Sequence, residues 1–201
     1  MKQILYFKAV ILSLLISGCG RNRQIVNTEH QDSLAQYRDT LIGRFNGIDI
    51  DTLICEPIDS LSPLEDDIFG GKHFKWRIYT ANNTVKDLII GNTTSIDFIS
   101  EGDLDGNGTE EWGYVGQYPS SRWTCYHAFT ATNKKWKPLF EPTPIWLSHI
   151  KTEELEGTIT YEDIAQPFQM KGYVNIKFSD IRNNGEDFLL IDTLVQAVTY
   201  K

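Results

Sequence analysis

The fold class of this chain can be argued outward from residues 95–117, which read SIDFISEGDLDGNGTEEWGYVGQ. β-Branched and aromatic residues flank a central run of Asp, Asn and Gly on both sides, which is typical of two strands joined by a polar loop. An EF-hand loop begins with similar acids, but it needs helices on both sides and a bidentate Glu at position 12. Position 12, counted from Asp103, is Tyr114. The segment therefore predicts a β-hairpin with a polar loop.

Comparable short runs recur from about residue 41 to the end of the sequence. They are rich in β-branched and aromatic residues and are separated by Gly, Asn, Asp and Pro, which is the pattern of antiparallel β-structure. Residues 81–84, Ala-Asn-Asn-Thr, suit a hairpin turn. The predicted fold class is mainly β, with antiparallel strands and hairpins and little helix. We expect strands at residues 51–55, 74–80, 85–90, 95–100, 111–117, 124–130, 136–140, 157–161, 172–178 and 188–195.

Helical spacing is weak and confined to two short segments. Four apolar residues between 34 and 42 follow the i, i+3, i+7, i+8 pattern, which predicts one helix over residues 33–43. Residues 151–156 are a second, shorter candidate for one helical turn.

Three segments share a small residue, a polar residue, an apolar residue and a turn cluster that leads into a strand. They are residues 43–47, 102–106 and 179–185, and their polar residues are spaced by 59 and 77 positions. Periods of this size indicate about three propeller-blade-like or β-meander repeats, each of which buries its apolar face against a neighbour. The alternative is that any β-rich chain contains such Asx/Gly turns.

The loop of the second segment offers oxygen atoms to a hard cation. Asp103, Asp105 and Asn107 stand at positions 1, 3 and 5, a main-chain carbonyl follows at Thr109, and Glu111 stands at position 9. Ca²⁺ takes six to eight oxygen ligands at short range, and Gly at position 6 allows the sharp turn that brings them together. The sequence predicts one structural Ca²⁺ site, with a solvated Asp/Asn/Gly turn as the alternative.

Residues 102–111 resemble the calcium loop of the FG-GAP/VCBS type of repeat, which occurs in integrin-like β-propellers and in many bacterial exported proteins. In that family the segment reads like Gly-Asp-apolar-Asp/Asn-Gly-Asp/Asn-Gly-x-x-Asp/Glu. The other two segments are degenerate copies, because Arg44 and Ile48 in the first and Arg182 and Phe188 in the last stand where ligands would be. The resemblance therefore implies that one loop alone holds metal.

The first residues read as an export signal. Lys2 and Lys8 precede the apolar run of residues 9–16, and the small pair Ser-Gly leads directly into Cys19. This resembles a bacterial lipobox, which implies cleavage before Cys19 and attachment of diacylglycerol to its thiol. The apolar run is about half the roughly 20 residues that span a bilayer, and the alternatives are an uncleaved anchor or a buried N-terminal strand.

These features predict the organisation of the chain. Residues 1–18 form a signal peptide, residues 19–33 hold the lipidated Cys19 and a flexible tether, and residues 34–201 form a single β-rich domain. Two or three acyl chains give lasting attachment to a membrane. Because Gly20 and Arg21 offer no acidic export tag, we expect the outer membrane, with its periplasmic side favoured over the cell surface.

Composition excludes nucleic acid as a main partner. The 201 residues carry 27 acidic and 19 basic side chains and 41% hydrophobic residues. Phosphate binding needs a concentrated Lys/Arg surplus, which this sequence lacks. The hydrophobic fraction is that of a folded chain.

The remaining two cysteines, Cys55 and Cys125, leave two alternatives open. An even number of cysteines outside the cytoplasm is compatible with a disulfide, and both lie in strand-like runs. They are equally compatible with two separate thiols that pack as small apolar residues.

No catalytic motif is present: the four histidines form no metal-ligand pair, and the chain has no nucleophile elbow or Gly-rich phosphate loop. Residues 112–146 are rich in aromatic rings, of which Trp112, Trp123 and Trp136 are candidates for a ligand platform, although such rings also fill β cores. The sequence favours a calcium-stabilised envelope lipoprotein that binds a glycan or a protein without catalysis. The alternative is a small envelope glycan-active hydrolase whose carboxylates are assembled by the fold.

Overall fold

The structure is a computed structural model that describes residues 37–61, 73–118, 121–153, 155–182 and 188–198. In these residues the chain is mainly β and contains no α-helix, only two 3₁₀ turns, η1 (Leu147–His149) and η2 (Tyr161–Asp163). The strands are β1 (Asp39–Gly43), β2 (Asp51–Leu61), β3 (His73–Thr80), β4 (Leu88–Thr93), β5 (Ser95–Gly102), β6 (Glu111–Gln117), β7 (Trp123–Thr132), β8 (Lys135–Pro138), β9 (Thr143–Trp146), β10 (Ala165–Pro167), β11 (Tyr173–Ser179) and β12 (Leu190–Gln196).

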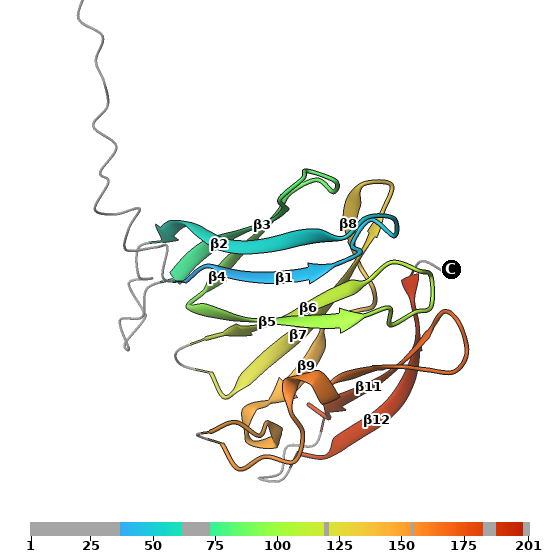
Figure 1. The fold of residues 1–201 in the computed structure, drawn as a ribbon. Helices are drawn as coiled ribbons and strands as arrows, with labels where there is room; N and C mark the ends of the chain where they lie inside the picture. The colour runs from blue at the N-terminus through green and yellow to red at the C-terminus, as the bar shows by residue number, and fades with distance from the viewer. Residues whose placement is uncertain (1–36, 62–72, 119–120, 154, 183–187, 199–201) are drawn as a thin grey trace, which may run out of the picture.

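These strands form three antiparallel sheets in which consecutive strands pair with each other, except that β9 pairs with β7 (Figure 1). The first sheet has the order β1-β2-β3-β4, the second β5-β6-β7-β8 with β9 paired to β7, and the third β10-β11-β12. Each sheet is a meander. The predicted mainly β fold with about three blade-like or meander units is confirmed.

The second sheet lies between the other two, and β6 is its most buried strand. Every residue of β6 except Gln117 is buried. Trp112 and Tyr114 belong to the core cluster shared with β2 and β3, whereas Val115 belongs to the cluster shared with β10–β12. Successive side chains of a strand point to opposite faces, so β6 contributes to both cores. This explains why β6 contains a continuous run of apolar and aromatic residues, whereas the sequence of a half-exposed strand would alternate between apolar and polar residues.

The first two of the repeated segments occupy equivalent places in their sheets. Gly43 ends β1 and pairs with Asp51, the first residue of β2. Gly102 ends β5 and pairs with Glu111, the first residue of β6. Each loop thus starts at a glycine and closes on an acid across the hairpin.

The burial of the apolar residue distinguishes the third copy from the other two. Phe45 and Leu104 are 0% and 1% exposed, whereas Ile181 in the third copy is 59% exposed. The third segment still connects two paired strands, β11 and β12. The first two copies therefore share a buried apolar residue in the loop, whereas the third copy shares only its position between two paired strands.

Sequence-based expectations about helix were wrong. Asp39–Gly43, the described end of the helix expected over residues 33–43, is strand β1 and pairs along its length with β2. Pairing with a neighbouring strand outweighs weak local helical spacing. Lys151 forms an isolated antiparallel bridge with Glu156 instead of a helical turn.

One expected strand does not form, and three were missed. Residues 157–161 contribute a single parallel bridge between Ile159 and Ile150, because Gly157 lies against the Ile150 backbone and η2 begins at Tyr161. The missed strands β1, β9 and β10 are five residues or shorter. The other expected strands are present with shifted ends.

The signal peptide, Cys19 and the tether predicted from the sequence lie outside the described residues. Within the described part of the chain, no helix is long and apolar enough to cross a membrane.

Candidate metal centre

The three acids predicted as calcium ligands converge at the end of the β5–β6 hairpin. One carboxylate oxygen from each of Asp103, Asp105 and Glu111 lies within 4.8 Å of the others. Asp103 is exposed, whereas Asp105 and Glu111 are 1% and 0% exposed. Two of the three charges are therefore withdrawn from water, and the third is at the surface. The structure brings together the carboxylates that the sequence indicated.

Local hydrogen bonds build the loop that presents these acids. The Asp105 carboxylate accepts from the backbone N–H of Asn107 at 3.0 Å, and that of Asp103 accepts from Gly108 N–H at 2.9 Å. The Asn107 amide oxygen accepts from Thr109 N–H at 2.6 Å. Gly108 has φ of +90°, in the left-handed region that glycine adopts without strain. Hydrogen bonds within residues 103–109 therefore hold the carboxylate and amide oxygens of this turn in place.

Glu111 is the most perturbed acid of the group. Its two oxygens accept hydrogen bonds from Leu104 N–H at 2.8 Å and from the Thr130 hydroxyl at 2.7 Å. Burial, with added repulsion from Asp105 and Asp103, raises its pKa to about 8 in spite of these hydrogen bonds. A buried carboxylate of this kind favours either a proton or a cation.

The donor set fits a hard cation. The converging side chains offer oxygen atoms alone, which suit Ca²⁺ or Mg²⁺ rather than a thiophilic metal. Three carboxylates against one divalent ion would leave the site near −1. The other two predicted ligands, the Asn107 side chain and the Thr109 carbonyl, belong to the same loop, where Asn107 already bonds the Thr109 backbone.

This loop, residues 103–110, touches all three sheets. Glu110 N–H donates to the Arg44 carbonyl at 3.2 Å, which ties the loop to the β1–β2 connection. The Asp105 carbonyl accepts from Gly172 N–H at 2.7 Å, which ties it to the start of β11. Thr130 reaches Glu111 from β7. A cation held here would lie at the junction of the three meanders.

The equivalent acid of the first sheet is satisfied without a cation. Asp51 is 3% exposed, and its carboxylate accepts from Asn82 Nδ2 at 3.1 Å and from the Thr84 hydroxyl at 2.8 Å. These uncharged donors come from the β3–β4 connection. The first copy therefore keeps a buried acid at this place, held by uncharged donors from the neighbouring connection.

The predicted tryptophan platform is wrong. Trp112 is 0% exposed in the core between the first two sheets, and the partly buried Trp136 packs edge-on against it at a centroid distance of 5.5 Å. Trp123 lies elsewhere, half-buried against Trp146 and Phe188. The three rings do not form one surface. Trp112 lies on β6, which is buried on both faces, and Trp123 is the first residue of β7.

The two cysteines are free thiols in this structure, which is the second of the two alternatives left by the sequence. Cys55 lies on β2 in the first sheet and Cys125 on β7 in the second. Burial raises the pKa of Cys55 to about 12, so this thiol is unreactive at neutral pH.

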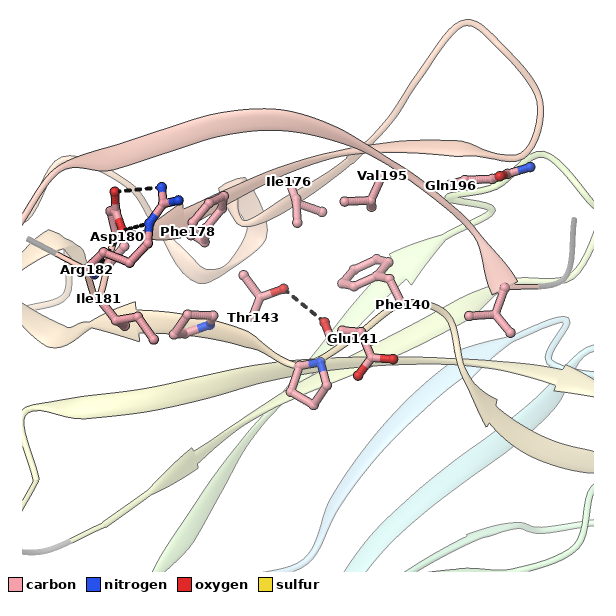
Figure 2. Close-up of a pocket in the computed structure, with 14 residues that line it drawn as sticks. Phe140, Glu141, Thr143, Ile176, Phe178, Asp180, Ile181, Arg182, Val195 and Gln196 are labelled. Atoms are coloured by element: carbon pink, nitrogen blue, oxygen red, sulfur yellow. Dashed lines mark hydrogen bonds and ion pairs between the residues drawn. The ribbon is translucent and has the colours of Figure 1, made fainter. Parts of the chain in front are cut away.

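A second feature is a cleft of about 550 Å³ between residues 140–144 and strands β11 and β12 (Figure 2). Asp180 and Arg182 form an ion pair at one end of it, with Nε 2.9 Å from Oδ1. Its inner wall is apolar and offers a ligand few directed hydrogen bonds. That wall consists of Phe140, Ile176, Phe178 and Val195.

A scan against protein-family models and searches of the curated proteins and of the solved structures find no match to this chain. The resemblance to an FG-GAP/VCBS calcium loop therefore rests on the sequence of residues 102–111 alone.

Proposed function

We propose that this chain is a membrane-anchored envelope lipoprotein whose β domain is stabilised by one Ca²⁺ and binds a partner, a glycan or a protein, without catalysis. The observation that carries this proposal is the convergence of Asp103, Asp105 and Glu111 within 4.8 Å, with two of the three buried. Burial of carboxylates without a compensating charge is costly, and a divalent cation removes most of that cost.

The position of the loop supports a structural role for the ion. Its backbone bonds to Arg44 and Gly172, and its buried acid bonds to Thr130, so a cation would tie together segments of three sheets. A metal that is bound only by the folded state stabilises that state by RT ln(1 + [L]/Kd), which grows with the logarithm of the metal concentration. Because Asp105 and Glu111 are buried and Asp103 is exposed, an ion would enter the site from the side of Asp103.

The membrane anchor is supported by residues 16–19, Ile-Ser-Gly-Cys. Strand β1 begins at Asp39, 20 positions after Cys19, which leaves room for a tether between lipid and domain. We place the anchor in the outer membrane, on the periplasmic side, because no acidic residue directly follows Cys19.

Isothermal titration with CaCl₂ tests the proposed metal centre. The full-length protein in detergent, stripped with chelator, should bind one Ca²⁺ per chain, and Asp105→Asn should abolish the heat of binding. Asp180→Asn is the matched control, because Asp180 occupies the third copy and is paired with Arg182. Equal binding by both variants would place the ion elsewhere.

A further inference from the structure

A polar cavity lies at the opposite end of the β5–β6 hairpin from the metal loop. It has a volume of about 590 Å³, within the range of about 300–1,000 Å³ that is usual for small-molecule sites. From Asp97 to Asp103 the chain advances six residues along β5 and the loop, which places the two sites about 20 Å apart. The residues that line the cavity are Thr94, Ser95, Asp97, Gln117, Tyr118, Leu147, Thr152, Glu153, Leu155 and Tyr161.

Three side chains from different elements form a hydrogen-bonded cluster in this cavity. Gln117 Nε2, on β6, donates to Asp97 Oδ2, on β5, at 2.6 Å. The same amide donates to the hydroxyl of Tyr161, on η2, at 3.1 Å. Burial, together with the charge of Asp97, raises the pKa of the Tyr161 hydroxyl. The polar groups are thus held in place before any ligand arrives, which lowers the entropic cost of binding.

The charge of the cavity restricts the class of ligand. Its ionisable residues are Asp97, Glu153 and the two tyrosines, and none of the described lining residues is Lys, Arg or His. An anionic ligand would meet two carboxylates and no basic side chain among the described residues that line the cavity. Phosphate, sulfate and uronic acids are therefore unfavourable.

The remaining chemistry suits a molecule with both hydroxyl groups and apolar C–H faces. The Asp97 carboxylate and the Gln117 amide oxygen offer acceptors, because both N–H groups of that amide are already donated within the cluster. The hydroxyl groups of Ser95 and Tyr118 can each donate or accept. Tyrosine presents an apolar ring face together with a polar tip. Two such rings, Tyr118 and Tyr161, line the cavity together with Leu147 and Leu155. The hydroxyl groups of a sugar would form hydrogen bonds with these polar groups, while the C–H faces of its ring pack against Tyr118 and Tyr161.

We propose that this cavity is a binding site for a neutral saccharide. The inference rests on the proposed function and deepens it. Of the two partner classes, glycan and protein, it selects the glycan and assigns its binding site to Asp97, Gln117, Tyr118 and Tyr161. It does not depend on the metal loop, which lies at the other end of the hairpin. It also replaces the tryptophan platform expected from the sequence with a polar, tyrosine-lined one.

Titration with a panel of tetrasaccharides tests this proposal. The neutral probes are chitotetraose, cellotetraose, maltotetraose and mannotetraose, and the charged probes are tetragalacturonic acid and chitosan tetramer. We expect the full-length protein in detergent to bind at least one neutral probe, and to bind tetragalacturonic acid at least tenfold more weakly than that probe. Absence of binding to every neutral probe, or tighter binding of the cationic chitosan tetramer, would overturn the proposal.

Variants place the bound saccharide in the cavity. Tyr118 is 36% exposed, so Tyr118→Ala removes its ring with little risk to the fold, and it should weaken binding at least tenfold while Tyr118→Phe retains most of it. Asp97→Asn should also weaken binding. Phe168→Ala is the control, because Phe168 is a similarly exposed ring, 40%, that lies outside the cavity. Loss of binding in the control, or none in Tyr118→Ala, would overturn the assignment.

The metal variant distinguishes failure of this inference from failure of the metal centre. Asp105→Asn should abolish the binding of Ca²⁺ and leave saccharide binding within twofold of the unmodified protein at a temperature where both are folded. Saccharide binding that disappears with calcium would contradict the independence of the two sites.

Discussion

The hydroxyl group of Thr130 donates a hydrogen bond of 2.7 Å to the carboxylate of Glu111, a side chain that is 0% exposed. Thr130 belongs to β7 and Glu111 to β6, so the pairing of these two strands sets the contact. An uncharged donor stabilises a buried carboxylate less than a cation does. The contact therefore holds the acid in position and leaves its charge to be balanced by a metal ion or a proton.

Glu111→Gln should have opposite effects on stability with and without calcium. The Gln amide oxygen can still accept from Leu104 N–H, and its NH2 group can donate to the Thr130 hydroxyl in place of accepting from it, so both contacts are kept without a charge. In chelator at pH 8 the variant should be more stable than the unmodified protein, because the buried charge and its repulsion by Asp105 are gone. In saturating calcium it should be the less stable of the two. Urea unfolding under both conditions measures the difference.

The matched control for this experiment is Glu110→Gln, which removes the neighbouring and more exposed carboxylate. It should change the calcium effect little. If Glu111→Gln is destabilised by the same amount in chelator and in calcium, Glu111 acts only as a hydrogen-bond acceptor.

Cys19→Ala should block processing of the precursor. The lipobox resemblance implies cleavage before Cys19 and attachment of lipid to its thiol, so the variant should keep residues 1–18 and gain no acyl mass. Intact-mass spectrometry of membrane fractions reads both properties at once. A mature N-terminus at another position in the unmodified protein, without added lipid mass, would contradict the lipoprotein proposal.

Trp112→Ala should destabilise the domain by about 3–5 kcal/mol, the usual cost of deleting a fully buried large aromatic side chain. Trp112 is 0% exposed and contacts Phe98, Phe129 and Trp136 in the core. Urea unfolding gives the free-energy difference. A cost well below 1 kcal/mol would indicate that this ring lies at the surface, as a ligand platform would require.

His127 should make stability fall on the acid side of neutrality. It stacks on Tyr114 at 4.6 Å, and burial lowers its pKa below the usual value of about 6.5. As pH falls through about 6.5, the unfolded chain takes up a proton before the folded chain does, so stability declines. His127→Phe keeps the stacked ring and does not titrate. Groups such as Glu111, whose raised pKa acts in the opposite direction, contribute equally to the variant and to the unmodified protein. The change in urea midpoint from pH 7.5 to 5.5 should therefore be less negative for the variant, and an equal change would remove His127 as a cause.

The metal loop could be predicted from the sequence because its determinants are local. Asp103 to Glu111 spans nine residues, and their order together with two glycines specifies a turn that folds carboxylates inward. Thr130 could not be predicted, since it lies 19 positions from Glu111 and reaches it only through the register of β6 with β7. Asp97 and Tyr161 meet at Gln117 for the same kind of reason.

The errors made from the sequence arise from tertiary context, which is burial in one case and strand pairing in the others. A run such as Trp-Gly-Tyr-Val is compatible with a surface platform or a core strand, and only the position of β6 between two other sheets decides for the core. Short strands were missed because β1 and β10 are held by their partners rather than by local preference. Local spacing near residue 40 favoured a helix, which pairing with β2 overrode.

Thermal unfolding of the full-length protein with calcium and with chelator tests the central claim most directly. At a hundredfold excess over Kd, Ca²⁺ should stabilise the fold by about 2.7 kcal/mol and raise the melting temperature accordingly. Asp103→Asn or Asp105→Asn should abolish the difference between the two curves, and Asp180→Asn should leave it intact. If the two curves of the unmodified protein coincide, residues 103–111 form only a turn, and the structural role of calcium is contradicted.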